Sequence, residues 1–64
     1  MPVKLGYATA KIETEKAVQF DTKEYGLIWI PKSVIHDDSE TWDMKNNKGE
    51  LIIHDWFAIK NGWL

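Results

Sequence analysis

The segment Tyr25-Gly26-Leu27-Ile28-Trp29-Ile30-Pro31 carries the strongest strand signal in this chain of 64 residues. It is rich in the β-branched and aromatic side chains that strands favour. Successive side chains of a strand point to opposite faces, so the apolar residues of this segment occupy both faces. We therefore expect Tyr25–Ile30 to lie in the centre of a sheet, or to have one face covered by the C-terminus. Pro31 has no N–H to donate and is expected to end the strand.

Four further strands are predicted around this segment, separated by polar turns. The connection Asp21–Glu24 suits a hairpin, and Asn46–Gly49 suits a turn because Asn and Gly tolerate a positive φ. The predicted fold class is mainly β: a small five-stranded antiparallel meander, or an SH3-like or OB-like barrel, with a short C-terminal helix. An open sheet packed by that helix is the alternative. The four further strands span Tyr7–Ile12, Lys16–Phe20, Glu40–Lys45 and Glu50–Ile53.

The C-terminal residues change from a strand pattern to a helical one. Asp55 suits the N-cap position, where a short polar side chain accepts a hydrogen bond from a free helix amide. Gly62 suits the left-handed position just past a helix, from which Trp63 can fold back onto Phe57 or Ala58. A helix this short is not stable alone, so we expect it to dock its aromatic face on the sheet.

The composition indicates how so short a chain, with residues 1–64 forming one domain, builds a core. There is no cysteine, and therefore no disulfide or thiolate metal site to support the fold. The aromatic residues are four Trp, two Tyr and two Phe, and each buries roughly 150–250 Å². We expect Trp29 and Phe57 to belong to the core, and Trp42 and Trp63 to be the exposed pair.

The charge pattern bears on the class of partner. The net charge is −2, and all eight basic residues are Lys. The absence of Arg argues against nucleic-acid binding, because Arg makes most bidentate phosphate and guanine contacts. No apolar run approaches the ~20 residues that span a membrane, and the N-terminus lacks the apolar stretch of a secretory signal. A soluble, cytoplasmic protein with no membrane contact is expected.

Two short motifs carry a resemblance to known proteins. Residues 29–35 read W-I-P-K-S-V-I, and residues 56–62 read W-F-A-I-K-N-G. Their order is similar to that in small uncharacterised proteins of bacteriophages and prophages, which share a W-I-P-x-S-x-I element and a W-[FL]-A-x-x-x-G tail. The resemblance covers roughly residues 16–62. It implies a phage or mobile-element origin, hence a host bacterial cell, and transfers no catalytic residues.

No pattern in the sequence predicts an enzyme, a metal or a cofactor. Nothing resembles a nucleophile elbow, a phosphate-binding Gly loop or a zinc-protease helix. The tripeptide Ile-His-Asp occurs at 35–37 and again at 53–55, and the two copies would supply zinc ligands if the strand ends met. We expect instead that each His lies at an exposed strand-to-loop junction and that each Asp caps the segment after it.

The acidic segment 37–43 is the predicted partner-binding surface. It holds four carboxylates and no Lys, with Trp42 among them. A solvated loop that only aids solubility is the alternative. Carboxylates on a rigid scaffold can complement a basic patch of a partner protein, and Trp is enriched at binding hot spots. The predicted binding residues are Asp37, Asp38, Glu40, Trp42, Asp43 and Trp63.

These features favour a non-catalytic interaction module, encoded by a phage or mobile element, that binds a protein. It would inhibit a host nucleic-acid or defence enzyme, in the manner of an anti-CRISPR protein. One alternative is an OB-like accessory factor for single-stranded DNA, which requires Lys side chains to gather on one face. Another is a structural virion component, which requires a self-complementary apolar patch at Trp42 and Trp63. A monomer or small homo-oligomer is expected. The lysines that the single-stranded DNA alternative would need on one face are Lys4, Lys11, Lys16, Lys23 and Lys32.

Overall fold

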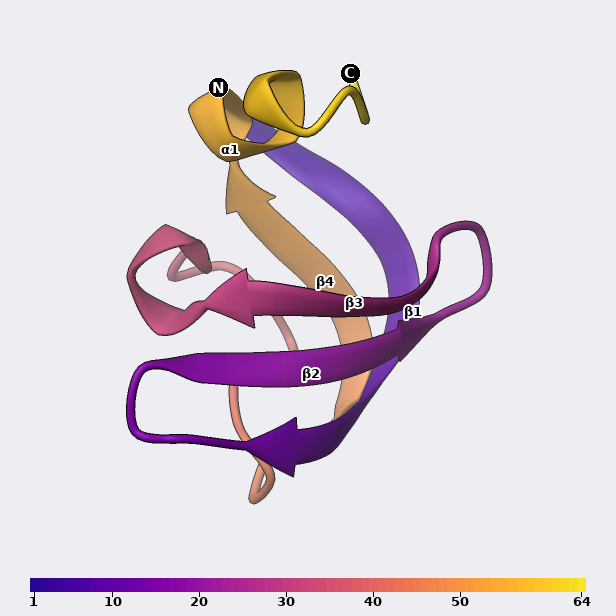
Figure 1. Ribbon diagram of the computed structural model, residues 1–64, viewed down its shortest axis with the longest axis vertical. Coiled ribbons are helices and arrows are strands. Elements are labelled where there is room, and N and C mark those ends of the chain that lie inside the picture. Colours follow the sequence, from indigo (N-terminus) through magenta and orange to yellow (C-terminus); the bar gives the residue numbers. More distant parts are fainter.

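Four antiparallel strands form one open sheet, and a short helix follows the last of them. The computed structural model describes residues 1–64 (Figure 1). The sheet order is β3-β2-β1-β4, which is a Greek key order because the fourth strand returns to lie beside the first. The elements are β1 (Pro2–Glu13), β2 (Ala17–Thr22), β3 (Gly26–Pro31), the 3-10 turn η1 (Lys32–Val34), β4 (Lys48–His54) and α1 (Asp55–Lys60).

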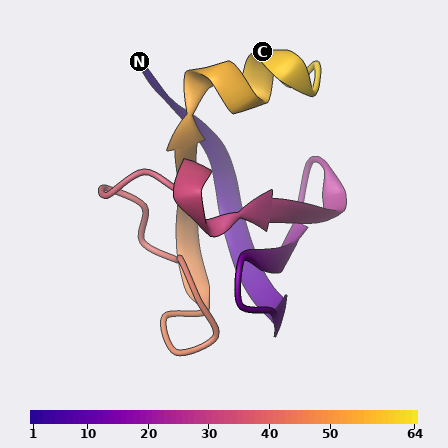
Figure 2. The same cartoon turned by 60° about the vertical axis from the view of Figure 1, so that its left-hand side comes forward.

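The first strand is long enough to pair with two neighbours. Its early part, Pro2–Thr9, pairs with β4, and its late part, Ala8–Glu13, pairs with β2. The register shifts once in each part, and such bulges bend a strand and increase its twist. The β2–β3 hairpin consequently crosses in front of the β1–β4 pair in Figure 1, and Figure 2 shows the same bend from the side.

The core lies on the inner face of this bent sheet. Val18, Phe20 and Thr22 alternate inward along β2 and are all buried, as the period of two requires. Every strand contributes to the cluster, and Val34 and Ala58 complete it from η1 and α1. The largest fully buried side chains are Phe20, Ile30, Leu51, Ile53, Val18, Val34 and Thr41.

The prediction that Tyr25–Ile30 is central in the sheet was wrong, because β3 is an edge strand. The fourth strand pairs with β1 and leaves β3 with a single neighbour. Ile28 and Ile30 face the core, whereas Leu27 and Trp29 lie exposed on the outer face. Trp29 is 46% exposed and is therefore not the core residue that its apolar surroundings predicted.

The predicted strand Glu40–Lys45 is a loop, so the sheet has four strands rather than five. The Asp43 carboxylate accepts a hydrogen bond from the Asn46 amide at 2.7 Å. The Thr41 hydroxyl donates to the Asn46 carbonyl, also at 2.7 Å. Such side-chain bonds to nearby backbone offer the chain an alternative to a strand ladder.

The outer edge of β4 is covered by the segment 35–40, which runs along it. The His36 amide donates to the Ile52 carbonyl at 2.8 Å, and the Glu40 amide donates to the Glu50 carbonyl at 2.9 Å. This edge is therefore occupied by the chain's own backbone, while the opposite edge of the sheet, along β3, carries no such cover.

The C-terminal tail folds back as predicted, with corrections at both ends. The Trp63 amide donates to the Ala58 carbonyl at 2.9 Å, and Gly62 has a φ of +74°. Trp63 is half-buried rather than exposed, because its ring lies 5.9 Å from that of Phe57. Asp55 is the first residue of α1 rather than its N-cap, and its carboxylate accepts from the N-terminal ammonium group at 2.8 Å. The structure contains no helix with the length and apolar character of a membrane span.

Candidate functional site

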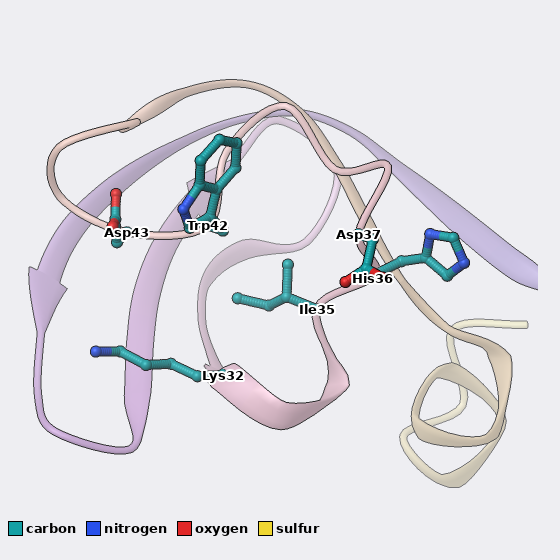
Figure 3. A pocket seen from close by; sticks show the side chains of 6 residues that line it. All are labelled: Lys32, Ile35, His36, Asp37, Trp42 and Asp43. Atoms are coloured by element: carbon teal, nitrogen blue, oxygen red, sulfur yellow. The ribbon is translucent and has the colours of Figure 1, made fainter.

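A cavity of about 340 Å³ opens between η1 and the loop that follows it. Figure 3 shows Trp42 and Asp43 on one side, Lys32 on the other and Ile35 between them, while the His36 ring points away. The sequence-predicted residues Asp37, Trp42 and Asp43 therefore meet at one cavity. The lining residues are Lys32, Ile35, His36, Asp37, Trp42 and Asp43.

Buried hydroxyl groups hold the loop that forms one wall of this cavity. Ser39 is buried, and its hydroxyl donates to the Thr41 carbonyl at 2.7 Å while accepting from the Ile52 amide at 3.0 Å. Thr41 has no exposed surface, and no buried side-chain nitrogen or oxygen lacks a partner. A loop with satisfied buried polar groups is rigid, so Trp42 is held at a defined place on the surface.

Glu13 ties both walls of the cavity to the end of β1. One carboxylate oxygen accepts from the Lys32 ammonium group, and the other accepts from the Met44 amide at 3.1 Å. Lys32 stands on η1 and Met44 on the opposite loop. The hydrogen bond from Lys32, followed by that from Met44, lowers the pKa of Glu13. Glu13 thus holds the two walls together while remaining ionised at neutral pH.

Acidification is expected to destabilise the fold as the pH drops through the ordinary Glu pKa of 4.5 and below. Because the Glu13 pKa is lowered in the folded state, the unfolded chain binds the proton more tightly. The stabilisation is complete above that value and is lost as the pH falls through the folded pKa. Urea midpoints measured against pH should decline less steeply for Glu13→Gln than for the wild type. Glu15→Gln, which removes an exposed carboxylate without partners, should follow the wild-type curve.

The Asp43 carboxylate and the Trp42 indole form the part of the cavity suited to binding. The pKa of Asp43 is lowered, first by the backbone hydrogen bond from Asn46, so the carboxylate carries a full negative charge at neutral pH. Trp42 is 45% exposed, as predicted. A carboxylate beside an exposed aromatic face favours a cation, because both attract positive charge.

Three other predicted site residues lie elsewhere. The Glu40 carboxylate accepts from the Glu50 amide at 2.8 Å and thus helps to cover the edge of β4. Asp38 is exposed. Its backbone amide donates a hydrogen bond to Nδ1 of His36 at 3.1 Å. Trp63 belongs to the aromatic cluster at the C-terminus, so it forms no exposed pair with Trp42. Of the acidic run, Asp37 and Asp43 therefore line the cavity, Glu40 helps to cover β4, and Asp38 lies exposed outside both.

No family model, curated protein or solved structure matches this chain. The residues at the cavity are therefore the basis for a proposed function. Sequence reasoning missed Lys32, Ile35 and His36 as members of the site. It also missed Glu13, which accepts a hydrogen bond from Lys32. A signal for the Glu13–Lys32 contact was present in the strand order. Glu13 ends β1, and Lys16, which pairs with Lys32 through a backbone hydrogen bond, begins the next hairpin only three residues later. That signal required the hairpin register, which composition alone does not provide.

The two Ile-His-Asp copies do meet, as a zinc site would require. Ile35 and Ile53 form a bridge, and the His36 and His54 rings lie 5.2 Å apart, edge to face. The Asp55 carboxylate does not join them, because it binds the N-terminal ammonium group. No three His, Asp or Glu side chains gather into a group that would hold a metal ion. The paired rings instead pack the junction between β4 and the segment that covers it.

Proposed function

We propose that the chain is a non-catalytic binding module whose cavity beside Trp42 accepts a Lys or Arg side chain of a partner protein. The observation that supports this most directly is that Trp42 lines one cavity together with Asp37 and with Asp43, whose lowered pKa keeps its carboxylate ionised. A cation over an aromatic face gains about 0.5–1 kcal/mol at an exposed site. The nearby carboxylates add Coulomb attraction and orientation.

The one ammonium group at the cavity does not oppose this assignment. Lys32 is paired with Glu13, so its charge is largely compensated. Lys4 likewise lies 3.8 Å from a carboxylate oxygen of Glu50. Two of the five lysines that a DNA-binding surface would need are therefore engaged with acids, which favours a basic protein partner over single-stranded DNA.

The proposed setting is the cytoplasm of a bacterial host. The phage-type W-I-P and W-F-A motifs support an origin in a phage or mobile element, and nucleic-acid enzymes expose basic surfaces to which a rigid acidic cavity is complementary. The chain would then act as an inhibitor of such an enzyme, blocking the groove without chemistry of its own. Proteins of bacterial defence systems that bind nucleic acid belong to this class of target.

Capture from a bacterial lysate tests the proposal, with nuclease-treated and untreated samples run in parallel. The wild-type protein is expected to retain a protein partner after nuclease treatment. The doubly neutralised variant Asp37→Asn/Asp43→Asn and the variant Trp42→Ala should each retain it about tenfold less. Asn at position 43 keeps an oxygen that can accept the Asn46 amide, so the loop is expected to stay folded.

Matched controls keep the experiment specific. Trp56→Ala removes another exposed indole, and Glu15→Gln removes an exposed carboxylate, both outside the cavity. Equal loss of the partner from cavity and control variants would contradict the proposal. Proteins that vanish with nuclease would instead favour the single-stranded DNA alternative. A direct check is the shift of the Trp42 indole N–H resonance by an Arg peptide but not by its neutral citrulline analogue.

A further inference from the structure

Asn61 and Gly62 form the only Asn-Gly pair of the chain, and they lie where α1 ends. The side-chain amide of Asn is chemically labile when the nitrogen of the next residue can reach it. Gly has no Cβ to shield that nitrogen, and a Cβ placed on Gly62 would meet no heavy atom within 4 Å. Asn61 is exposed to the solvent. The two reacting groups and the water that the reaction needs therefore meet at this place.

Hydrogen bonds hold the pair in an unreactive geometry while the chain is folded. The Asn61 Nδ2 group donates to the Phe57 carbonyl at 2.9 Å, and the Gly62 amide donates to the Ile59 carbonyl at 3.1 Å. The Asn61 ψ is 2°, and a large rotation about this bond is needed before the Gly62 nitrogen lies against the side-chain carbon Cγ. That rotation breaks the Gly62 hydrogen bond. The fold therefore delays the reaction, and local opening at the end of this short helix permits it.

We propose that Asn61 is a site of spontaneous deamidation, and that opening of the last turn of α1 sets its rate. The Gly62 nitrogen loses its proton to the solvent and bonds to Cγ of Asn61. The bond from Cγ to Nδ2 breaks, and the amide group takes up a proton and leaves as ammonia. Water then opens the resulting succinimide ring at either carbonyl. The products are Asp at position 61, or isoaspartate, in which the main chain runs through the side-chain carbons.

Neither product keeps the hydrogen bonds that end α1. A carboxylate at position 61 has no proton to donate to the Phe57 carbonyl, and its charge is unfavourable at the carboxyl end of a helix. Isoaspartate also adds a carbon to the main chain. The Trp63 amide then no longer lies opposite the Ala58 carbonyl, to which it donates at 2.9 Å. The Trp63 ring, 5.5 Å from that of Tyr25, is expected to leave the aromatic cluster.

Mass spectrometry of the protein during incubation in heavy-oxygen water tests the site. Conversion at Asn61 is expected in the folded protein, with one heavy oxygen atom taken up per converted chain. In urea above the unfolding midpoint every chain is open, so the rate should rise about tenfold or more. Asn46 and Asn47, which no Gly follows, are internal controls and should stay intact over the same period. Asn61→Gln closes the larger ring slowly and should not convert.

A pair of Trp variants tests the control by the tail. Trp63→Ala removes the ring that packs the tail against Phe57, so conversion of the folded protein should be several-fold faster. Trp29→Ala removes an indole that is 46% exposed and lies outside the tail, and it should convert at the wild-type rate. Circular dichroism reports whether each variant is folded. Urea below the unfolding midpoint opens the tail without any substitution and should accelerate the wild type in the same way.

The indole N–H resonance of Trp63 reports the consequence, and it should move toward that of an exposed indole in the converted protein. A folded protein in which Asn61 stays intact while the urea-unfolded chain converts completely overturns the proposal. So does a rate that neither urea nor Trp63→Ala changes, or a converted protein in which the Trp63 resonance stays in place. The cavity beside Trp42 contains none of these residues, so the proposed function stands or falls separately.

Discussion

The Phe20→Ala variant is expected to lose a large part of the stability of the fold. Phe20 is fully buried at the centre of the core, and truncation of a buried Phe costs about 3–5 kcal/mol. At about 0.05–0.15 kcal/mol per residue, a chain of 64 residues has a total stability of only about 3–10 kcal/mol. Far-ultraviolet circular dichroism and urea titration of wild type and variant measure the difference.

Ile59→Ala is the matched control, because it also removes apolar side-chain atoms. Ile59 is exposed on α1, and surface substitutions usually change stability by about 0.5 kcal/mol or less. Ala is also a better helix former than Ile. A Phe20→Ala protein with the urea midpoint of the wild type, or an Ile59→Ala protein as unstable as Phe20→Ala, would contradict the core assignment.

The strands that could be predicted from the sequence are those with a local pattern. Val18 and Phe20 alternate with polar neighbours, and the apolar run ending at Ile53 follows a turn rich in Asn and Gly. Both segments are strands, β2 and β4, with boundaries that differ by one to two residues from those predicted. The mainly β class and the C-terminal helix were correct for the same reason. These features depend on the nearest neighbours in the chain.

The place of each strand in the sheet could not be predicted in this way. The apolar pattern of Leu27 and Trp29 indicated burial on both faces, yet these side chains are exposed because β4 pairs with β1. That choice depends on the bend of β1, which lets one strand pair with two others. It follows from contacts far apart in the sequence, and strand periodicity carries no information about them.

The candidate site also combines features that follow from local sequence with features that follow from long-range contacts. The acidic run with Trp42 was singled out from the sequence as a binding surface, and three of its residues line the cavity. The shape of the loop comes from the buried hydroxyl groups of Ser39 and Thr41, which a polar stretch of sequence does not distinguish from solvated ones. The opposite wall comes from Lys32, brought near by the hairpin register. The sequence thus indicates one of the two segments that form this surface, but not the other, which is brought near only by the fold.

Gly49→Ala is expected to destabilise the protein by about 2–6 kcal/mol and to disturb the loop beside the cavity. Gly49 is buried in β4 and has a φ of +143°, where a side chain is strained, at a cost of about 1–3 kcal/mol. A Cβ at this position would lie 2.6 Å from the Cβ of Glu40. Relieving that overlap by moving packed groups costs about 1–3 kcal/mol more. Urea unfolding and the Trp42 indole resonance report the two effects.

Two comparisons separate the strain from the overlap with Glu40. Gly62→Ala introduces a side chain at a φ of +74° with no heavy atom within 4 Å, so it carries the backbone cost alone, about 1–2 kcal/mol. In a double-mutant cycle, Glu40→Gly removes the Cβ that Gly49→Ala would meet. The cost of Gly49→Ala should then fall toward that of Gly62→Ala, because only the strain remains. An unchanged cost in that background would mean that the close packing of β4 against residue 40 does not limit this position. The segment 35–40 would then lie loosely on the edge of β4, and Trp42 would lose the rigid support on which the cavity depends.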